Sequence, residues 1–289
     1  MAWEDRDYYR DRPRFGMSGM GGRSVVTWLI LINLGVWVLD TILTTASRGG
    51  PLISPFYWGN FNVAQAVYGG QVWRFFTYQF LHAGLLHVAF NLIGLFFFGP
   101  MVEAWLGSRR FLAFYLLCGA CGSVVFTALG FVPGLLPSAG APLIGASGAV
   151  FGVLAAAAVI APRQEVLFMF IIKMQIRTMV LIFLGIAVLS VILGSQNAGG
   201  EAAHLGGAVL GFVLIRNAGW LNWADGFSAP DLKGAIDQHR RESAAKREAA
   251  TEAEIDRILA KVSEHGLHSL TAKEKRILSS ETERRNKAG

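Results

Sequence analysis

The chain has 289 residues, of which 53% are hydrophobic and only 16% are charged, and its mean hydropathy is +0.43. Soluble domains carry about 25% charged residues, so the composition excludes that class and indicates a protein that crosses a membrane several times. The net charge of +6 is explained by Arg and Lys flanking the spans, because no basic stripe interleaved with aromatics indicates a nucleic-acid partner.

Residues 1–23 are too polar and too acidic for a signal or transit peptide, so we expect an uncleaved, polar N-terminus. A helix needs about 17 to 25 apolar residues to cross the hydrocarbon core. We predict six spans, at 24–43, 83–102, 111–132, 143–161, 178–194 and 202–215. The sixth rises only about 21 Å as a helix, so its neighbours must shelter it.

The segment between the first two spans, 44–81, is long and rich in aromatic residues. Aromatic side chains prefer the headgroup level of a bilayer, so we expect this loop to lie along the membrane interface, held by Trp73 and Arg74. With six spans, both termini share one side with the short loops that carry Arg109, Arg110, Arg163, Lys173 and Arg177. This excess of positive charge predicts cytoplasmic termini.

The composition changes after the sixth span, where residues 217–289 become charged and rich in alanine. This change predicts a cytoplasmic tail. A helix within it is expected to begin at Thr271, because Glu274 three positions later completes a capping box. We predict a helical hairpin over 252–280, which is either a solvated appendage or a docking element.

Polar side chains inside the spans are costly in lipid and are therefore candidates for function. Asn91 lies early in the second span, Ser147 early in the fourth and His204 early in the sixth. Because these spans run in the same direction, they bring the three side chains to the same outer half of the bundle. His87 lies one helical turn before Asn91 on the same face.

A serine hydroxyl is a poor nucleophile until an adjacent base, most often histidine, takes its proton. Ser147 beside His204 would supply this pair, which predicts acyl-transfer chemistry. The tetrahedral intermediate then needs hydrogen-bond donors for its oxyanion. Backbone N–H groups at the start of the fourth span and the side chains of His87 and Asn91 can supply them.

Two further features of this region have more than one interpretation. Gly145 and Gly148 either let the backbone approach the reacting carbonyl closely or are packing residues between helices. The outer half also contains two acids, Asp40 and Glu201. Glu201, three residues before His204, either orients that histidine or ends the span as a surface charge.

Three motifs, HAGLLHVAFN, GASGAVFG and AHLGGAVLG, occur in this order on the second, fourth and sixth spans. Together they resemble the rhomboid family of intramembrane serine proteases, over about residues 24–216. The resemblance implies an all-α membrane protein, a six-helix rhomboid bundle carrying a small helical tail. It also implies a catalytic dyad of Ser147 and His204, with His87 and Asn91 as oxyanion-stabilising residues, and it implies no cofactor or metal.

The resemblance assigns roles to several supporting residues beside Gly145 and Gly148. Phe151 would stack on the catalytic histidine, and Gly207 would bring the sixth span against the fourth. Glu103 and Arg109 resemble a polar pair of the family's cytoplasmic loop. His82 either acts in the site or hydrogen-bonds the aromatic loop.

We therefore expect an intramembrane serine endopeptidase, in a bacterial inner membrane, that cuts other membrane proteins in or near their transmembrane segments. The main alternative is an inactive rhomboid-like binder, a class that usually lacks the serine or the histidine. A metal enzyme built on His82, His87 and His204 would be expected to show a motif such as H-E-x-x-H, which is missing. A small transporter would be supported by two related halves, which are not evident.

Overall fold

The computed structural model describes residues 24–46, 54–132, 139–168, 171–226, 251–266, 269–271 and 273–279. The chain divides into two compact units, Met1–Phe227 and Ser228–Gly289. The expected polar N-terminus, residues 1–23, lies outside the described residues.

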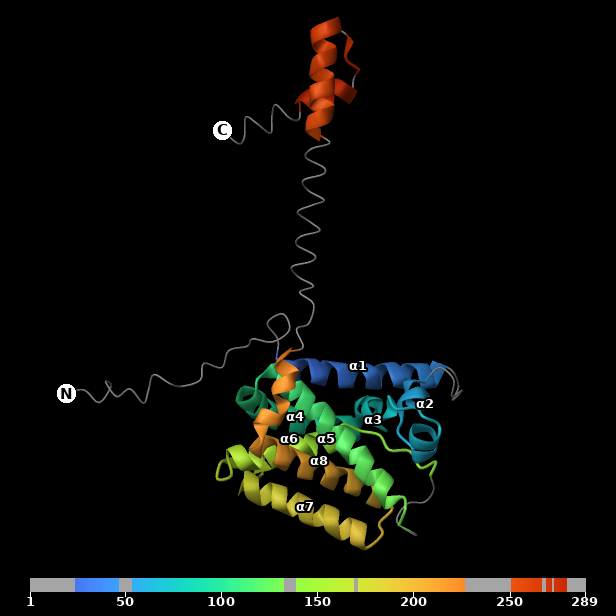
Figure 1. The fold of residues 1–289 in the computed structure, drawn as a ribbon, viewed down its shortest axis with the longest axis vertical. Coiled ribbons are helices and arrows are strands. Elements are labelled where there is room, and N and C mark those ends of the chain that lie inside the picture. The colour runs from blue at the N-terminus through green and yellow to red at the C-terminus, as the bar shows by residue number, and fades with distance from the viewer. Residues whose placement is uncertain are drawn as a thin grey trace, which may run out of the picture. The chain divides into compact units, whose positions relative to one another are not determined.

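Apolar helices build the first unit (Figure 1). Its six main helices are α1 (Val25–Ala46), α4 (Leu85–Leu106), α5 (Ser108–Leu129), α6 (Ser147–Ile160), α7 (Ile176–Ile192) and α8 (Ala198–Arg216). Among the described residues, α1, α4, α5 and α8 are long and apolar enough to cross a membrane, while α6 and α7 are shorter apolar helices. The prediction of a six-helix, multi-pass membrane protein is confirmed.

The last of these helices is longer than the sequence predicts. α8 begins at Ala198, and its 19 residues rise about 28 Å, close to the thickness of a hydrocarbon core. The prediction starts this span at residue 202 because a charged residue usually ends an apolar run. In the structure Glu201 instead lies inside the first turn of α8, where His204 is its partner.

The shortest of the six helices, α6, lies inside the bundle, and Figure 1 shows α6 and α8 between α1 and α7. Glycines set its contact with α8. A Cβ atom at Gly207 would lie 1.9 Å from the carbonyl oxygen of Gly148, and one at Gly211 would lie 2.5 Å from that of Gly152. Because no side chain fits there, these positions fix how α8 packs on α6.

The aromatic segment after α1 folds into short helical pieces. They are α2 (Pro55–Gly59), η4 (Ala64–Tyr68), α3 (Arg74–Thr77) and η5 (Tyr78–Phe80). The guanidinium of Arg74 is buried and donates to the carbonyl oxygens of Asn60 and Tyr57, the latter at 3.0 Å. The indole of Trp73 donates to the carbonyl oxygen of Trp58 at 3.2 Å. The two residues named from the sequence therefore hold this segment together.

Charged residues meet where α4 ends, α5 begins and α8 runs into η6 (Ala218–Gly226). We call Glu103, Arg109, Arg110 and Asp225 the arginine end of the unit. Arg110 forms a salt bridge with Asp225, and Arg109 donates to the backbone carbonyl of Asp225 at 2.8 Å.

The expected pairing of Glu103 with Arg109 is not found among the described residues. The Glu103 carboxylate instead accepts from the backbone N–H groups of Val25, at 2.9 Å, and Val26, at 3.1 Å. It also accepts from the hydroxyl of Ser108 at 2.6 Å. Glu103 therefore satisfies free N–H groups at the start of α1.

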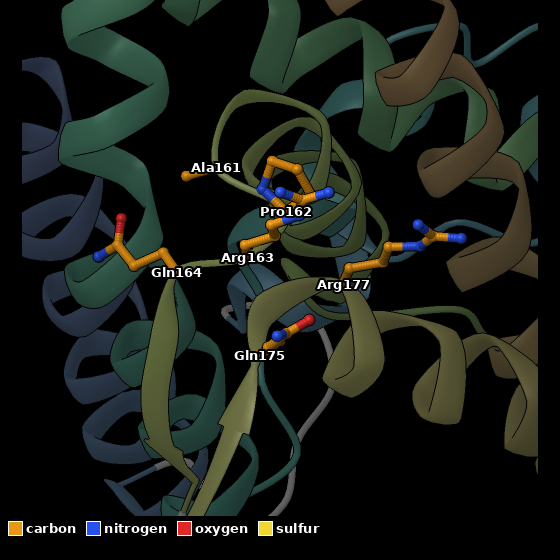
Figure 2. A pocket seen from close by; sticks show the side chains of 6 residues that line it. All are labelled: Ala161, Pro162, Arg163, Gln164, Gln175 and Arg177. Atoms are coloured by element: carbon orange, nitrogen blue, oxygen red, sulfur yellow. The ribbon is translucent and has the colours of Figure 1, made fainter.

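A small antiparallel hairpin, β1 (Glu165–Phe168) and β2 (Ile172–Gln175), joins α6 to α7. The all-α prediction missed these strands, although the fold is mainly helical. Figure 2 shows a pocket beside the hairpin, with Arg163 and Arg177 among the side chains that line it. This pocket lies at the end of α6, about 21 Å along the helix from Ser147.

The second unit contains helices at 251–265 and 273–279. The backbone N–H of Thr271 donates to the Glu274 carboxylate at 2.8 Å, and the N–H of Glu274 donates to the Thr271 hydroxyl at 3.3 Å. This reciprocal pair is a capping box at the start of the second helix. Lys261, on the first helix, also binds the Glu274 carboxylate at 2.9 Å and links the two helices.

Candidate active site

Ser147 and His204 come from different helices and meet at hydrogen-bond distance. The serine Oγ lies 2.7 Å from the histidine Nε2. Ser147 is the first residue of α6, and His204 lies in the second turn of α8. The contact requires both helices to begin at the same end of the bundle, which we call the serine end.

Two further groups fix the imidazole of His204. The ring of Phe151, one turn into α6, stacks on it with a centroid distance of 4.3 Å and an interplanar angle of 7°. The carboxylate of Glu201 lies 2.9 Å from its Nδ1. An ionised carboxylate can only accept, so the imidazole Nδ1–H donates to Glu201, which assigns the Nδ1–H tautomer and leaves Nε2 free to accept from the Ser147 hydroxyl.

The backbone just before Ser147 has an unusual shape. Gly145 has a φ of +118°, a conformation that side chains disfavour. A Cβ atom there would lie 2.6 Å from the Nε2 of His87 and 3.6 Å from the Oγ of Ser147. Because Gly145 has no side chain, the His87 imidazole and the Ser147 hydroxyl can both lie close to its Cα atom, in one small space.

His87 and Asn91 lie on the first turns of α4, beside this space. The Nδ1 of His87 accepts a long hydrogen bond, 3.4 Å, from the backbone N–H of Ala83. This leaves its Nε2–H directed at the space beside Gly145. Asn91 is buried and donates one amide hydrogen to the carbonyl oxygen of His87 at 2.8 Å, which keeps a second amide hydrogen available.

His82 supports the same region from the loop before α4. Its Nε2 accepts from the backbone N–H of Ala146 at 3.4 Å, and its ring packs edge-on against His87 at 5.0 Å. His82 therefore contacts groups of the serine end, and it also interacts with the backbone of Phe80 at the end of the aromatic loop. Gly148 packs near the hydroxyl of Tyr78, at 3.3 Å from a notional Cβ.

The structure thus brings together Ser147, His204, Phe151, His87 and the glycines around them, and it places His82 and Asn91 against His87. It adds one whose role the sequence left open, Glu201, whose spacing from His204 was the available signal. Asp40, the other acid considered, lies elsewhere and accepts from the hydroxyl of Ser54 at 2.6 Å. Such a set can activate a hydroxyl and bind an oxyanion.

Comparison with known proteins identifies the family of this chain. Residues 69–219 match the Rhomboid domain, and residues 237–281 match a family of unknown function, DUF6576. The chain is 30% identical over 212 residues to the rhomboid protease GluP of Bacillus subtilis, covering 73% of this chain and 36% of GluP.

Two other relatives are similar at the same level. RHOMBOID-like protein 12, mitochondrial, of Arabidopsis thaliana is 28% identical, over 68% of this chain and 59% of that protein. The rhomboid protease GlpG of Haemophilus influenzae is 29% identical, over 50% of this chain and 68% of GlpG. The match spans less than two thirds of the first two relatives. The Rhomboid domain covers more than half of the present chain, and the chain therefore belongs to the rhomboid family of intramembrane proteases.

Proposed function

We propose that this chain is an intramembrane serine endopeptidase in which Ser147 is the nucleophile and His204 is its base. The distance of 2.7 Å between serine Oγ and histidine Nε2 is the observation that carries the proposal. Relatives whose names describe them as rhomboid proteases support it. An inactive binder would not need this contact between a hydroxyl and a free imidazole nitrogen.

The reaction follows from the positions of these groups. His204 Nε2 accepts the hydroxyl proton while Ser147 Oγ bonds to the substrate's carbonyl carbon, and the carbonyl oxygen becomes an oxyanion. His204 then returns the proton to the leaving amine as the C–N bond breaks. Water, deprotonated by the same nitrogen, hydrolyses the resulting ester and restores the serine.

The oxyanion has donors on two elements. The first backbone N–H groups of α6 have no partner within the helix, and they lie beside Ser147. The Nε2–H of His87 faces the same space, and the Asn91 amide lies on the next turn of α4. Donors of this kind each contribute about 10²- to 10³-fold to the rate of an acyl transfer.

Substrates of a rhomboid protein are membrane proteins. We propose that the cleaved bond lies near the end of a transmembrane segment that unwinds locally, because helical hydrogen bonds shield a carbonyl from attack. We further propose a bacterial inner membrane and cytoplasmic termini, supported by the cations Arg109, Arg110 and Arg163 at the end of the bundle away from Ser147.

The test is labelling of the detergent-solubilised protein with a fluorophosphonate probe. Wild type should be labelled. Ser147→Ala and His204→Ala should not be labelled, although their thermal stability should match that of wild type. Ser123→Ala is the control, because Ser123 is a buried serine of α5 whose hydroxyl donates to the Ala120 carbonyl. Equal labelling of all variants would contradict the dyad. An unlabelled wild type that also leaves a transmembrane substrate uncut in liposomes would identify a binder.

A further inference from the structure

The carboxylate of Glu201 lies beside Nδ1 of His204, which is the position of the acid in a serine–histidine–acid triad. We propose that Glu201 is a positioning residue for His204, so that the dyad works as a Ser147–His204–Glu201 triad. This inference rests on the proposed function. It concerns how the base is held and charged, and Glu201 itself is not expected to contact the substrate.

The geometry joins the two side chains within one helix. Glu201 lies in the first turn of α8, three residues before His204, a spacing that places both on one face. Its Oε2 lies 2.9 Å from Nδ1 of the ring. The side chains of His204 and Glu201 are only 15% and 20% exposed, so water does not fully screen the contact.

The carboxylate is itself held in place. The side-chain amide of Asn197, which precedes α8, donates to Glu201 Oε1 at 3.3 Å. A Cβ atom at Gly200 would lie 2.4 Å from the Asn197 Oδ1, so glycine makes the space for that side chain. The result is a chain of hydrogen bonds from Asn197 through Glu201 and His204 to Ser147.

A purely structural role does not explain this arrangement. Any carboxylate in the first turn of α8 would complement the helix dipole, wherever its oxygens pointed. Here one oxygen is turned to the ring nitrogen that lies away from the nucleophile. Among the described residues, the ring also neighbours the hydroxyl of Ser147, the aromatic face of Phe151 and the His87 imidazole, and these three groups carry no negative charge.

The contact has two chemical consequences for the base. An Nδ1–H that donates to Glu201 keeps Nε2 unprotonated, which is the form that can accept the serine proton. Once that proton arrives, the imidazolium lies beside a negative charge that stabilises it. Both effects act on the reacting state, so losing Glu201 should lower kcat and leave KM nearly unchanged.

The first experiment measures kcat and KM with a fluorogenic transmembrane substrate. Because Phe151 still holds the ring plane, Glu201→Ala should lower kcat about 10- to 100-fold, less than the roughly 10⁴-fold known for a triad acid in serine proteases. Glu201→Gln keeps a hydrogen-bond acceptor without the charge, so its kcat should lie between those of wild type and Glu201→Ala. Glu201→Asp keeps the charge and should recover part of the lost kcat. A kcat for Glu201→Ala within twofold of wild type would overturn the proposal.

A matched control removes a different carboxylate of the same kind. Glu103→Gln changes a buried acid whose partners in the described part of the chain are backbone N–H groups and the Ser108 hydroxyl. It should lower the thermal midpoint without changing kcat. If Glu103→Gln and Glu201→Gln lower kcat equally, the effect of Glu201 is only structural and the proposal is wrong.

The second experiment reads the tautomer of His204 by ¹⁵N NMR of the histidine-labelled protein. Wild type should show a protonated Nδ1, and Glu201→Ala should shift the neutral ring toward the Nε2–H form. An unchanged tautomer would overturn the proposal even if kcat fell. Ser147→Ala separates the two claims: if its activity is lost while Glu201→Ala is fully active, only this inference fails. An inactive wild type contradicts the proposed function and this inference with it.

Discussion

The serine end and the arginine end each place a carboxylate at a helix start, and the two carboxylates have different kinds of partner. Glu103 accepts from two backbone N–H groups and one hydroxyl, none of which changes charge in a reaction. Glu201 accepts from an imidazole that must gain a proton if Ser147 reacts. The group that donates to the carboxylate, more than its burial, therefore decides its role. A carboxylate bonded to backbone N–H groups stabilises the fold, whereas one bonded to an imidazole can support chemistry.

The same contrast extends to the other polar groups. At the arginine end, Arg110 and Arg109 are both bonded to Asp225. At the serine end, the His87 Nε2–H faces the space beside Gly145 and Ser147, and the first N–H groups of α6, which begins at Ser147, have no partner within the helix. Donors without a fixed partner are costly in lipid, so the donors beside Ser147 favour a site that binds a transient anion there.

The largest effect should come from separating α6 and α8. Gly207→Ala would put a Cβ 1.9 Å from the Gly148 carbonyl oxygen, so the helices must move apart. We expect a loss of about 3 kcal/mol of stability and loss of fluorophosphonate labelling, measured with thermal unfolding. The control is Gly185→Ala on α7, where nothing lies within 4 Å. A Gly207→Ala protein with wild-type stability and labelling would show that this contact does not set the site.

The next effect tests the donors of the serine end. His87→Ala removes an N–H beside Gly145 and should lower kcat about 10²-fold, measured on a transmembrane substrate. His82→Ala should lower kcat less than His87→Ala does. His82 contacts the N–H of Ala146, the residue before Ser147, and the His87 ring. A larger loss for His82→Ala than for His87→Ala would reverse the assignment of these two histidines.

Much of this contrast could be predicted from the sequence. The long apolar runs gave six helices, and the shared direction of three of them placed Asn91, Ser147 and His204 at one end. The start of α8 and the contact of Glu201 with His204 could not be predicted from the sequence. A charged residue beside an apolar run usually marks the end of the membrane span, so the sequence predicts that the helix begins after Glu201. Whether a carboxylate at that spacing turns to the ring or to water depends on its rotamer and on neighbours such as Asn197, which only the folded structure fixes.

The short strands and short helical pieces also could not be predicted from the sequence. The hairpin strands β1 and β2 are four residues each, too short for their alternation to stand out beside the apolar helices. The aromatic segment folds through the carbonyl partners of Arg74, which are set by distant backbone. Local periodicity therefore predicted the spans, whereas contacts between elements decided the details.

A smaller effect is expected when the stabilising carboxylate of the arginine end is removed. Glu103→Ala leaves the N–H groups of Val25 and Val26 without their acceptor. The loss of a helix cap costs about 1 kcal/mol, so the thermal midpoint should fall while kcat per folded molecule stays at the wild-type value. A loss of kcat comparable to that of Glu201→Ala would remove the distinction between the two ends.

The smallest effect concerns the salt bridge of Arg110 and Asp225, whose side chains are 32% and 49% exposed. Hydrogen bonding from Arg110 is the main cause that lowers the pKa of Asp225. A carboxyl whose folded pKa lies below its unfolded value, about 3.9, stabilises the fold above that pH and loses its contribution as the pH falls through the lowered pKa.

Asp225→Asn should therefore lower the thermal midpoint only slightly near neutral pH, because exposed ion pairs contribute little. The difference from wild type should begin to shrink near pH 4 and should disappear once the pH has fallen through the lowered pKa of Asp225, and kcat should not change. A difference that grows as the pH falls would mean that protonated Asp225 is the stabilising form, contrary to its contact with Arg110. A change in kcat would instead couple this end of the bundle to the serine end, because the polar contacts of Asp225 within the described part of the chain are with Arg109 and Arg110 and do not include Ser147 or His204.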